Sequence, residues 1–215
     1  MESGTHHIFL PGWGAAASAY APGLPAGWTA LDPPRFAESS GSLEVYLAWL
    51  AGELEARPGP LVLAGHSMGA ALSVLAAAAF PHRVQRLVLF SPAGLPLVKP
   101  IAVSAVQFML QMVTGRLTLQ ESLAAIANVA RAPRSAYRVA CAVRELDLSR
   151  EMQAVSAAGI PVTIVGCDSD TLVTGRHCRR AADLLQARYR ELSLEGGHMW
   201  MFGQWAPLAA ELRLV

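Results

Sequence analysis

The sequence predicts an α/β protein with a mostly parallel β-sheet of about six strands, helices on both faces and an inserted helical cap. Apolar runs of strand length alternate along the chain with segments of helical periodicity, which is typical of a parallel sheet covered on both sides. The strand signal disappears between Pro92 and about Ala158, where only helical patterns remain. With 215 residues, 53% of them apolar, the chain can bury a sizeable core.

Residues 1–80 carry three predicted strands and two predicted helices. Each strand is a short apolar run that is followed by Pro, Gly or Asp, and the strands cover residues 6–10, 28–31 and 61–64. Residues 43–57 place apolar side chains at helical spacing, and the Pro58-Gly59-Pro60 turn ends that helix. A second helix is expected from Ser67 to about Phe80, before Pro81.

The second half repeats this alternation after the strandless block. Residues 86–90 form a predicted strand before the block, and residues 161–165 form one after it. A helix near 175–189, a strand over 189–194 and a final amphipathic helix over 204–214 complete the pattern.

Four helical segments make up the strandless block: residues 101–114, 118–131, 134–146 and 149–158. We therefore expect residues 1–92 and 159–215 to form the core, and residues 93–158 to form a cap inserted between two core strands. Phe108, Met109 and Met112 share one helical stripe in this cap. The stripe either packs against neighbouring helices or lines an apolar substrate tunnel, and both readings stay open.

Composition and charge exclude several classes of protein. The net charge is +1 and the 17 basic residues are scattered, so no electrostatic surface for nucleic acid is expected. No apolar run approaches the eighteen or so residues of a membrane span, and no secretory signal is apparent. The three cysteines lack metal-ligand spacing, and their odd number favours a reducing compartment. We therefore expect a cytoplasmic protein.

The segment Gly65-His66-Ser67-Met68-Gly69 joins a predicted strand to a predicted helix, the setting of a nucleophile elbow. Glycine at both ends has a steric reason, because side chains two residues either side of a strained serine would collide at so tight a turn. The hydroxyl of Ser67 would then lie at the N-terminus of a helix, where backbone N–H groups favour negative charge. The alternative is a small residue at an ordinary strand–helix junction.

A serine hydroxyl needs a base to accept its proton, and the base needs an acid to orient it. Among six histidines, His198 follows a strand end and the flexible Gly196-Gly197, so its loop could bring an imidazole over the sheet. Asp168 and Asp170 both follow the preceding strand, and either could instead cap the next helix. The residues alone leave this choice open.

The chain order of Ser67, an Asp and His198 resembles the α/β-hydrolase superfamily. The resemblance rests on "LPGWG", "GHSMG", "DTLVT" and "GGHMW", and it covers the chain except the cap. It implies Asp170 as the acid, and it implies an oxyanion hole formed by the N–H groups of Trp13 and Met68. The family has a histidine where this chain has Pro11, and its usual first hairpin has no counterpart here.

The resemblance implies a serine hydrolase that cleaves a carboxylic ester, thioester or lactone through an acyl-enzyme, without a metal or organic cofactor. Trp13, Met199 and Trp200 near the site, with the cap stripe, favour a small-molecule substrate with an apolar portion. Carbon–carbon bond hydrolases, acyltransferases, lyases and cofactor-free dioxygenases share this framework and remain alternatives. A non-catalytic ligand-binding protein is the other alternative. The oligomeric state is left open.

Overall fold

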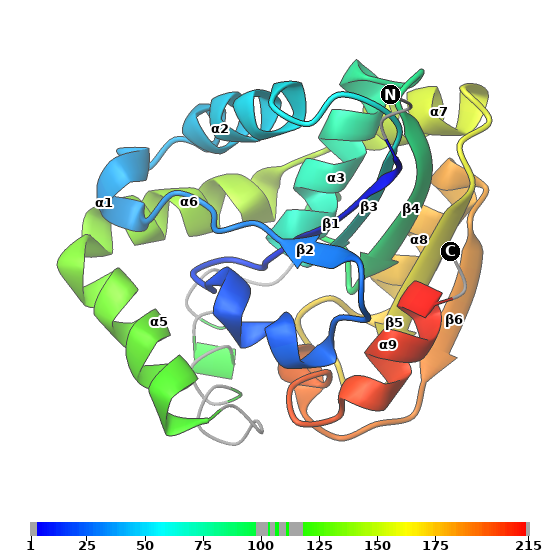
Figure 1. The fold of residues 1–215 in the computed structure, drawn as a ribbon. Coiled ribbons are helices and arrows are strands. Elements are labelled where there is room, and N and C mark those ends of the chain that lie inside the picture. The colour runs from blue at the N-terminus through cyan, green and yellow to red at the C-terminus, as the bar shows by residue number, and fades with distance from the viewer. Residues whose placement is uncertain (1–3, 98–102, 104–105, 108–110, 112–117, 214–215) are drawn as a thin grey trace.

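The computed structural model describes residues 4–97, 103, 106–107, 111 and 118–213, and it contains a six-stranded parallel sheet (Figure 1). The predicted fold class is thereby confirmed. The strands lie in the order β2-β1-β3-β4-β5-β6. Their bounds are β1 His6–Leu10, β2 Trp28–Ala30, β3 Leu61–His66, β4 Val84–Phe90, β5 Val162–Cys167 and β6 Arg188–Leu192.

Apart from the short helix α1, which was not predicted, the helices begin and end within a few residues of the predicted bounds, except that α8 ends four residues early. They are α1 Phe36–Ser39, α2 Leu43–Glu55, α3 Met68–Ala79, α5 Leu119–Arg131, α6 Pro133–Glu145, α7 Ser149–Ala157, α8 Gly175–Leu185 and α9 Trp205–Arg213. Three short 3-10 turns were not predicted: η1 Ala17–Ala19, η2 Ala21–Gly23 and η3 Gly197–Met199. The helix expected over 101–114 falls mostly outside the described residues.

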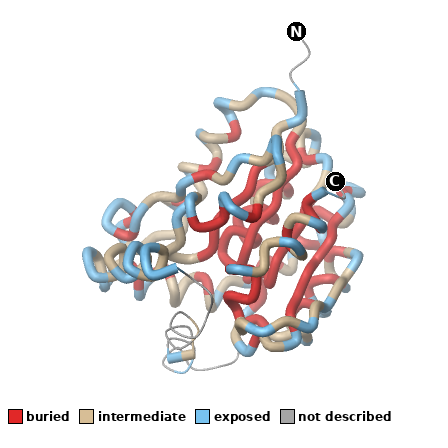
Figure 2. The backbone as a smooth tube through the Cα atoms, turned by 60° about the horizontal axis from the view of Figure 1, so that its bottom comes forward, coloured by how far each residue is buried: buried red, intermediate tan, exposed pale blue. Residues whose placement is uncertain are grey.

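Side chains of the central strands alternate between two hydrophobic cores, one on each face of the sheet. On β4, for example, Leu87 and Leu89 face one core while Val88 and Phe90 face the other. Both faces are buried, which is why these strands are almost continuously apolar in sequence. The central strands form the most buried part of the chain, surrounded by more exposed segments (Figure 2).

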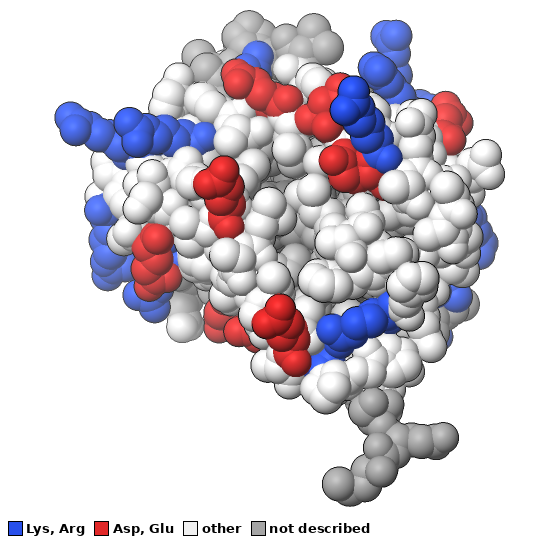
Figure 3. Space-filling model, turned by 90° about the horizontal axis from the view of Figure 1, so that it is seen from above, with Lys and Arg blue, Asp and Glu red and all other residues white. Residues whose placement is uncertain are grey.

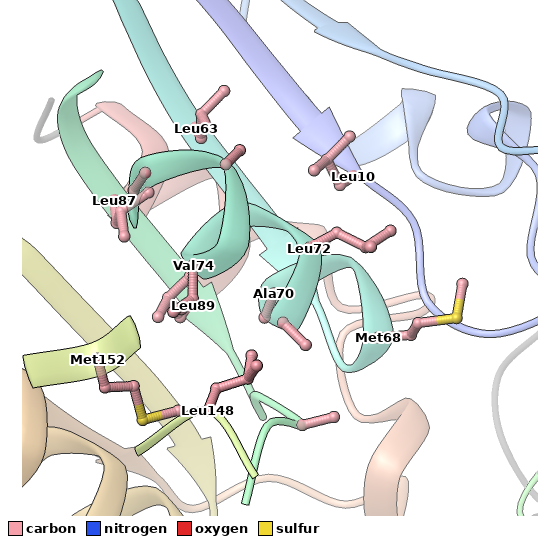
Figure 4. Packing of buried hydrophobic residues seen from close by; sticks show 14 of the residues in the cluster. Leu10, Leu63, Met68, Ala70, Leu72, Val74, Leu87, Leu89, Leu148 and Met152 are labelled. Carbon is pink, nitrogen blue, oxygen red and sulfur yellow. The ribbon is translucent and has the colours of Figure 1, made fainter. Parts of the chain in front are cut away.

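One face of the sheet packs against α2, α3, α7 and α8. In Figure 4, Val74 of α3 lies close to Leu89 of β4, Leu72 lies on the side of α3 nearer to Leu10 of β1, and Met152 of α7 lies beside Leu148. Every residue of α3 from Met68 to Val74 is buried, so this helix lies between the sheet and its neighbours. Its small side chains allow that close approach, which accounts for the alanine-rich sequence after Ser67.

The opposite face is covered by α9, by the 3-10 turns near residues 17–23 and by residues 199–202. Leu208 and Leu212 of α9 pack in the same core as Val165 and Cys167 of β5, and Figure 1 shows α9 across β5 and β6. Tyr20, which follows η1, is 1% exposed in this core. Segments far apart in the sequence therefore meet beneath this face.

The helices of the block expected to be a cap pack in two different parts of the molecule. Helices α5 and α6 pack against α1, and α6 also packs against α2, at the end of the sheet away from β6 (Figure 1). Helix α7 instead packs against α3 and α8 in the layer that covers the sheet, and Met152 is fully buried there. The division into core and cap remains a proposal, and these contacts favour ending the cap before Ser149.

Figure 3 shows basic and acidic side chains interspersed over the face near the amino ends of the strands. Within the described ranges, no helix is both long and apolar enough to cross a membrane. The same residues contain no group of three or more His, Cys, Asp or Glu side chains arranged to hold a metal ion.

Candidate active site

The three predicted catalytic residues each follow the carboxyl end of a strand. Ser67 directly follows β3, Asp170 follows β5, and His198 lies in η3 after β6. Because all six strands are parallel, their carboxyl ends meet at one edge, which is where open α/β sheets bind ligands.

The backbone of Ser67 is strained. Its φ of 54° and ψ of −115° lie in a backbone region that residues other than glycine rarely adopt. Backbone hydrogen bonds join it to β4 and to the segment after β4: the Ser67 N–H donates to Phe90 O at 3.0 Å, and the Ala93 N–H donates to Ser67 O at 3.1 Å. The residue is 8% exposed, so it lies at the edge of the buried core.

Close backbone approach explains both glycines of the pentapeptide. A Cβ atom on Gly65 would lie 2.4 Å from the carbonyl carbon of Gly69. A Cβ atom on Gly69 would lie only 2.0 Å from the carbonyl oxygen of Leu10, at the end of β1. These distances are far below van der Waals contact, so the turn requires glycine at both positions. The same contact brings the loop after β1 against the first turn of α3.

His198 and Asp170 form a buried pair. The Nδ1 atom of His198 lies 2.8 Å from Oδ2 of Asp170, and both side chains are almost fully buried. A carboxylate at Nδ1 keeps the proton on that nitrogen and leaves Nε2 as the acceptor. The pair therefore has the arrangement of a histidine base and its orienting acid.

The two aspartates of the segment have different surroundings. The other oxygen of Asp170, Oδ1, accepts hydrogen bonds from the backbone N–H groups of Leu172 and Val173, each at 2.9 Å. Burial by itself raises the pKa of Asp170, but the neighbouring His198 and the hydrogen-bond donors hold this pKa below its ordinary value. Asp168 instead lies on the exposed side and accepts a hydrogen bond from the Ser193 hydroxyl, which lowers its pKa.

The backbone of His198 is held on both sides by side chains. Its N–H donates to Oε1 of Gln111 at 3.0 Å, and Nε2 of Gln111 donates to Oγ1 of Thr171 at 3.2 Å. Its carbonyl oxygen lies 3.1 Å from Nε2 of His66, and the rings of the two histidines are 4.7 Å apart. His66, the residue before the serine, thus contacts the loop that carries the predicted base.

The two predicted oxyanion donors lie on adjoining segments. Met68 is the first residue of α3, where a backbone N–H has no carbonyl partner within its own helix. Trp13 lies in the loop after β1, its indole N–H donates to the carbonyl of Ala136 in α6 at 3.3 Å, and its ring packs on Phe36. The contact between Gly69 and Leu10 brings these two segments together.

The predicted substrate-contacting residues have mixed positions. Trp200 is fully buried, and its indole N–H donates to the hydroxyl of Ser91 at 3.2 Å. Met199 is 8% exposed and packs in the same core. These contacts favour a supporting role for both residues beneath the site. Phe108, Met109 and Met112 lie outside the described residues.

Three residues near the site were not predicted from the sequence. Tyr20, His66 and Gln111 contact residues of the site that are distant from them in the sequence. No sequence motif of short spacing predicts such contacts. The histidine of "GHSMG" was the one available signal, because a polar side chain at the end of a buried strand requires partners.

A buried histidine, His66, and a half-buried one, His177, predict a loss of stability in mild acid. Burial lowers the pKa of His66 well below 6.5, assisted by the nearby His198, and burial also lowers the pKa of His177. Below about pH 6.5 the unfolded chain binds protons that the native chain does not, so the free energy of unfolding falls as pH falls. Each histidine contributes a slope of up to about 1.4 kcal/mol per pH unit. Urea unfolding at pH 7 and pH 5 measures this, and equal free energies at both would contradict it.

The chain belongs to the alpha/beta hydrolase family, whose model matches residues 8–211. This membership agrees with the parallel sheet and with the order of the candidate residues along the chain. It supports a hydrolase as the class of protein. Comparison with curated proteins gives no match that would narrow this class further.

Solved structures with the same fold cover almost the whole chain. A bromoperoxidase from Bacillus anthracis has a TM-score of 0.78 at 15% identity, with 99% of this chain and 92% of that chain covered. A lipase-esterase related protein from Clostridium acetobutylicum has a TM-score of 0.76 at 15% identity, covering 98% and 93%. A carboxylesterase from the thaumarchaeon Nitrososphaera gargenis has a TM-score of 0.72 at 13% identity, covering 99% and 89%. At such identities the likeness shows the fold alone.

Proposed function

We propose that this protein is a serine hydrolase that cleaves a carboxylic ester, thioester or lactone. Ser67 is the nucleophile, His198 the general base and Asp170 the acid that orients His198. Names of structural neighbours, which include an esterase-related protein and a thioesterase domain, agree with acyl transfer as the reaction class.

The observation that carries this proposal is the backbone of Ser67. A residue with φ of 54° and ψ of −115° costs about 1–3 kcal/mol, and the side chain of Ser67 makes no capping hydrogen bond to α3 that would offset this cost. An ordinary strand–helix junction would take a relaxed conformation or a glycine here. The strain presents the hydroxyl at the edge of the sheet, where a substrate carbonyl could reach it.

The reaction follows from the groups at this edge. Nε2 of His198 takes the proton of Ser67 as the hydroxyl oxygen attacks the carbonyl carbon, and Asp170 stabilises the imidazolium. The N–H groups of Trp13 and Met68 bind the oxyanion, an effect worth about 3 kcal/mol for each donor. His198 then gives its proton to the leaving group and activates a water molecule, which releases the acid.

The loop after β1 that carries Gly12 and Trp13, called the oxyanion loop below, has surroundings that favour an apolar portion of the substrate. The rings of Trp13 and Phe36 pack with centroids 4.7 Å apart, and α6 closes over them through the Ala136 carbonyl. A substrate that reaches Ser67 past this loop would meet aromatic and aliphatic surface.

The proposal is tested with a fluorophosphonate probe and a substrate panel. We expect the native protein to be labelled once per chain, with the adduct on the peptide that contains Ser67, and heat-denatured protein to stay unlabelled. p-Nitrophenyl esters of two to ten acyl carbons, a matched thioester and a carbon–carbon bond substrate then identify the scissile bond. A native protein that neither takes the label nor turns over any ester or thioester would contradict the proposal.

A further inference from the structure

Three segments of the site are joined by one series of buried hydrogen bonds. The Gly12 N–H donates to the hydroxyl of Tyr20 at 3.2 Å, and that hydroxyl lies 2.7 Å from Nδ1 of His66. Nε2 of His66 lies 3.1 Å from the carbonyl oxygen of His198. Because a carbonyl oxygen can only accept, Nε2 carries the proton and Nδ1 accepts from Tyr20. Both nitrogens of His66 are engaged, so His66 is not a second base.

Each end of this series lies next to a group that the proposed reaction uses. Gly12 precedes Trp13 in the oxyanion loop, His66 precedes Ser67, and the accepting carbonyl belongs to His198 itself. The His198 loop has little rigidity of its own, because Gly196 and Gly197 both take positive φ angles, 117° and 60°. A donor from the rigid end of β3 fixes that loop relative to the serine.

The surroundings keep the direction of these hydrogen bonds constant. Tyr20 is packed between Phe9 and Phe202, with ring centroids 4.8 and 5.1 Å away, so its hydroxyl has little freedom to turn aside. Burial holds the pKa of His66 well below its ordinary value, so His66 stays neutral and Nδ1 remains an acceptor.

We infer that Tyr20 and His66 are positioning residues that fix the His198 loop and the oxyanion loop relative to Ser67. This inference rests on the proposed function, since it concerns the geometry of the same site. It assigns the histidine of the pentapeptide a role in the rate of the reaction, beyond filling the core. Neither residue touches the reacting atoms.

Two variants of His66 separate the two hydrogen bonds. The amide nitrogen of glutamine reaches the position of Nε2, so His66→Gln keeps a donor for the His198 carbonyl. The shorter His66→Asn offers an acceptor to Tyr20 but cannot reach His198. We expect His66→Asn to lower kcat for p-nitrophenyl acetate and the rate of fluorophosphonate labelling by about tenfold to about a hundredfold, with KM within about twofold. His66→Gln should stay within about threefold of the wild type.

The melting temperature of each variant distinguishes positioning from stability. A purely structural role would lower kcat in both variants in proportion to the unfolded fraction, and that result would overturn the inference. If His66→Asn does not fold, Tyr20→Phe serves instead, because it removes only the hydroxyl and keeps the packed ring. We expect about a fivefold lower kcat for Tyr20→Phe, and a wild-type kcat would overturn the inference.

The same assays keep this inference separate from the proposed function. Activity retained by a Ser67→Ala protein would remove the proposed function and this inference with it. Loss of activity in Ser67→Ala, together with wild-type rates in the folded His66 and Tyr20 variants, would remove the inference alone.

Discussion

Replacing Ser67 with alanine is expected to lower turnover of p-nitrophenyl esters by about 10⁴-fold or more while the fold stays intact. Alanine keeps the Cβ atom and therefore the strained backbone, so only the nucleophilic oxygen is lost. Any residual rate would come from the oxyanion donors and substrate binding. Circular dichroism and the melting temperature confirm the fold, and steady-state kinetics measure the loss.

Replacing Ser67 with glycine tests whether the backbone at this position is strained. Ser67→Gly should be equally inactive, yet more stable than Ser67→Ala by about 1 kcal/mol. Relief of strain is worth about 1–3 kcal/mol, and the extra freedom of glycine in the unfolded chain offsets about 0.5–1 kcal/mol of it. Urea unfolding of the two variants gives the difference. An inactive pair in which glycine is the less stable would show that the backbone of Ser67 is not strained.

Replacing Asp170 with asparagine is expected to lower kcat by about 10³-fold to 10⁴-fold. The backbone N–H groups of Leu172 and Val173 both donate to Oδ1, so the amide oxygen of asparagine must occupy that position. The amide NH₂ then faces Nδ1 of His198, which must become an acceptor. The proton moves to Nε2, and His198 can no longer accept the proton of Ser67.

Asp168→Asn is the matched control for this change. It makes the same substitution two residues away, but Asp168 is exposed and its carboxylate accepts from Ser193 at the surface. We expect kcat to stay within about threefold of the wild type. A large loss in Asp168→Asn with little effect of Asp170→Asn would reassign the acid to Asp168.

The local part of the site was readable from the sequence because its requirements are local. Within the pentapeptide around Ser67, a Cβ atom on Gly65 would lie 2.4 Å from the carbonyl carbon of Gly69, four residues later, whereas Leu10 of β1 sets the requirement for glycine at position 69. The two aspartates could not be separated in that way. Both follow β5, and what differs is burial and the presence of His198, which arrives from a loop almost thirty residues later.

The sequence also did not determine where the cap ends. Helical periodicity identified α7 correctly as a helix, because its apolar residues recur at helical spacing. The same periodicity is satisfied by packing on other cap helices or on α3, so it could not say which layer the helix joins. The contacts of Met152 with the sheet-covering layer depend on how the chain returns towards β5.

The sequence by itself determined the alternation of strands and helices, the elbow around Ser67 and the order of the candidate residues along the chain. Each of these depends on periodicity, turn chemistry or sterics within a few residues. Only the tertiary structure decided that Asp170 meets His198 and that Tyr20 and His66 join the oxyanion loop to the His198 loop. Tyr20 and His66 are 46 positions apart, His66 and His198 are 132 positions apart, and Asp170 and His198 are 28 positions apart. Only the folded sheet brings these residues together.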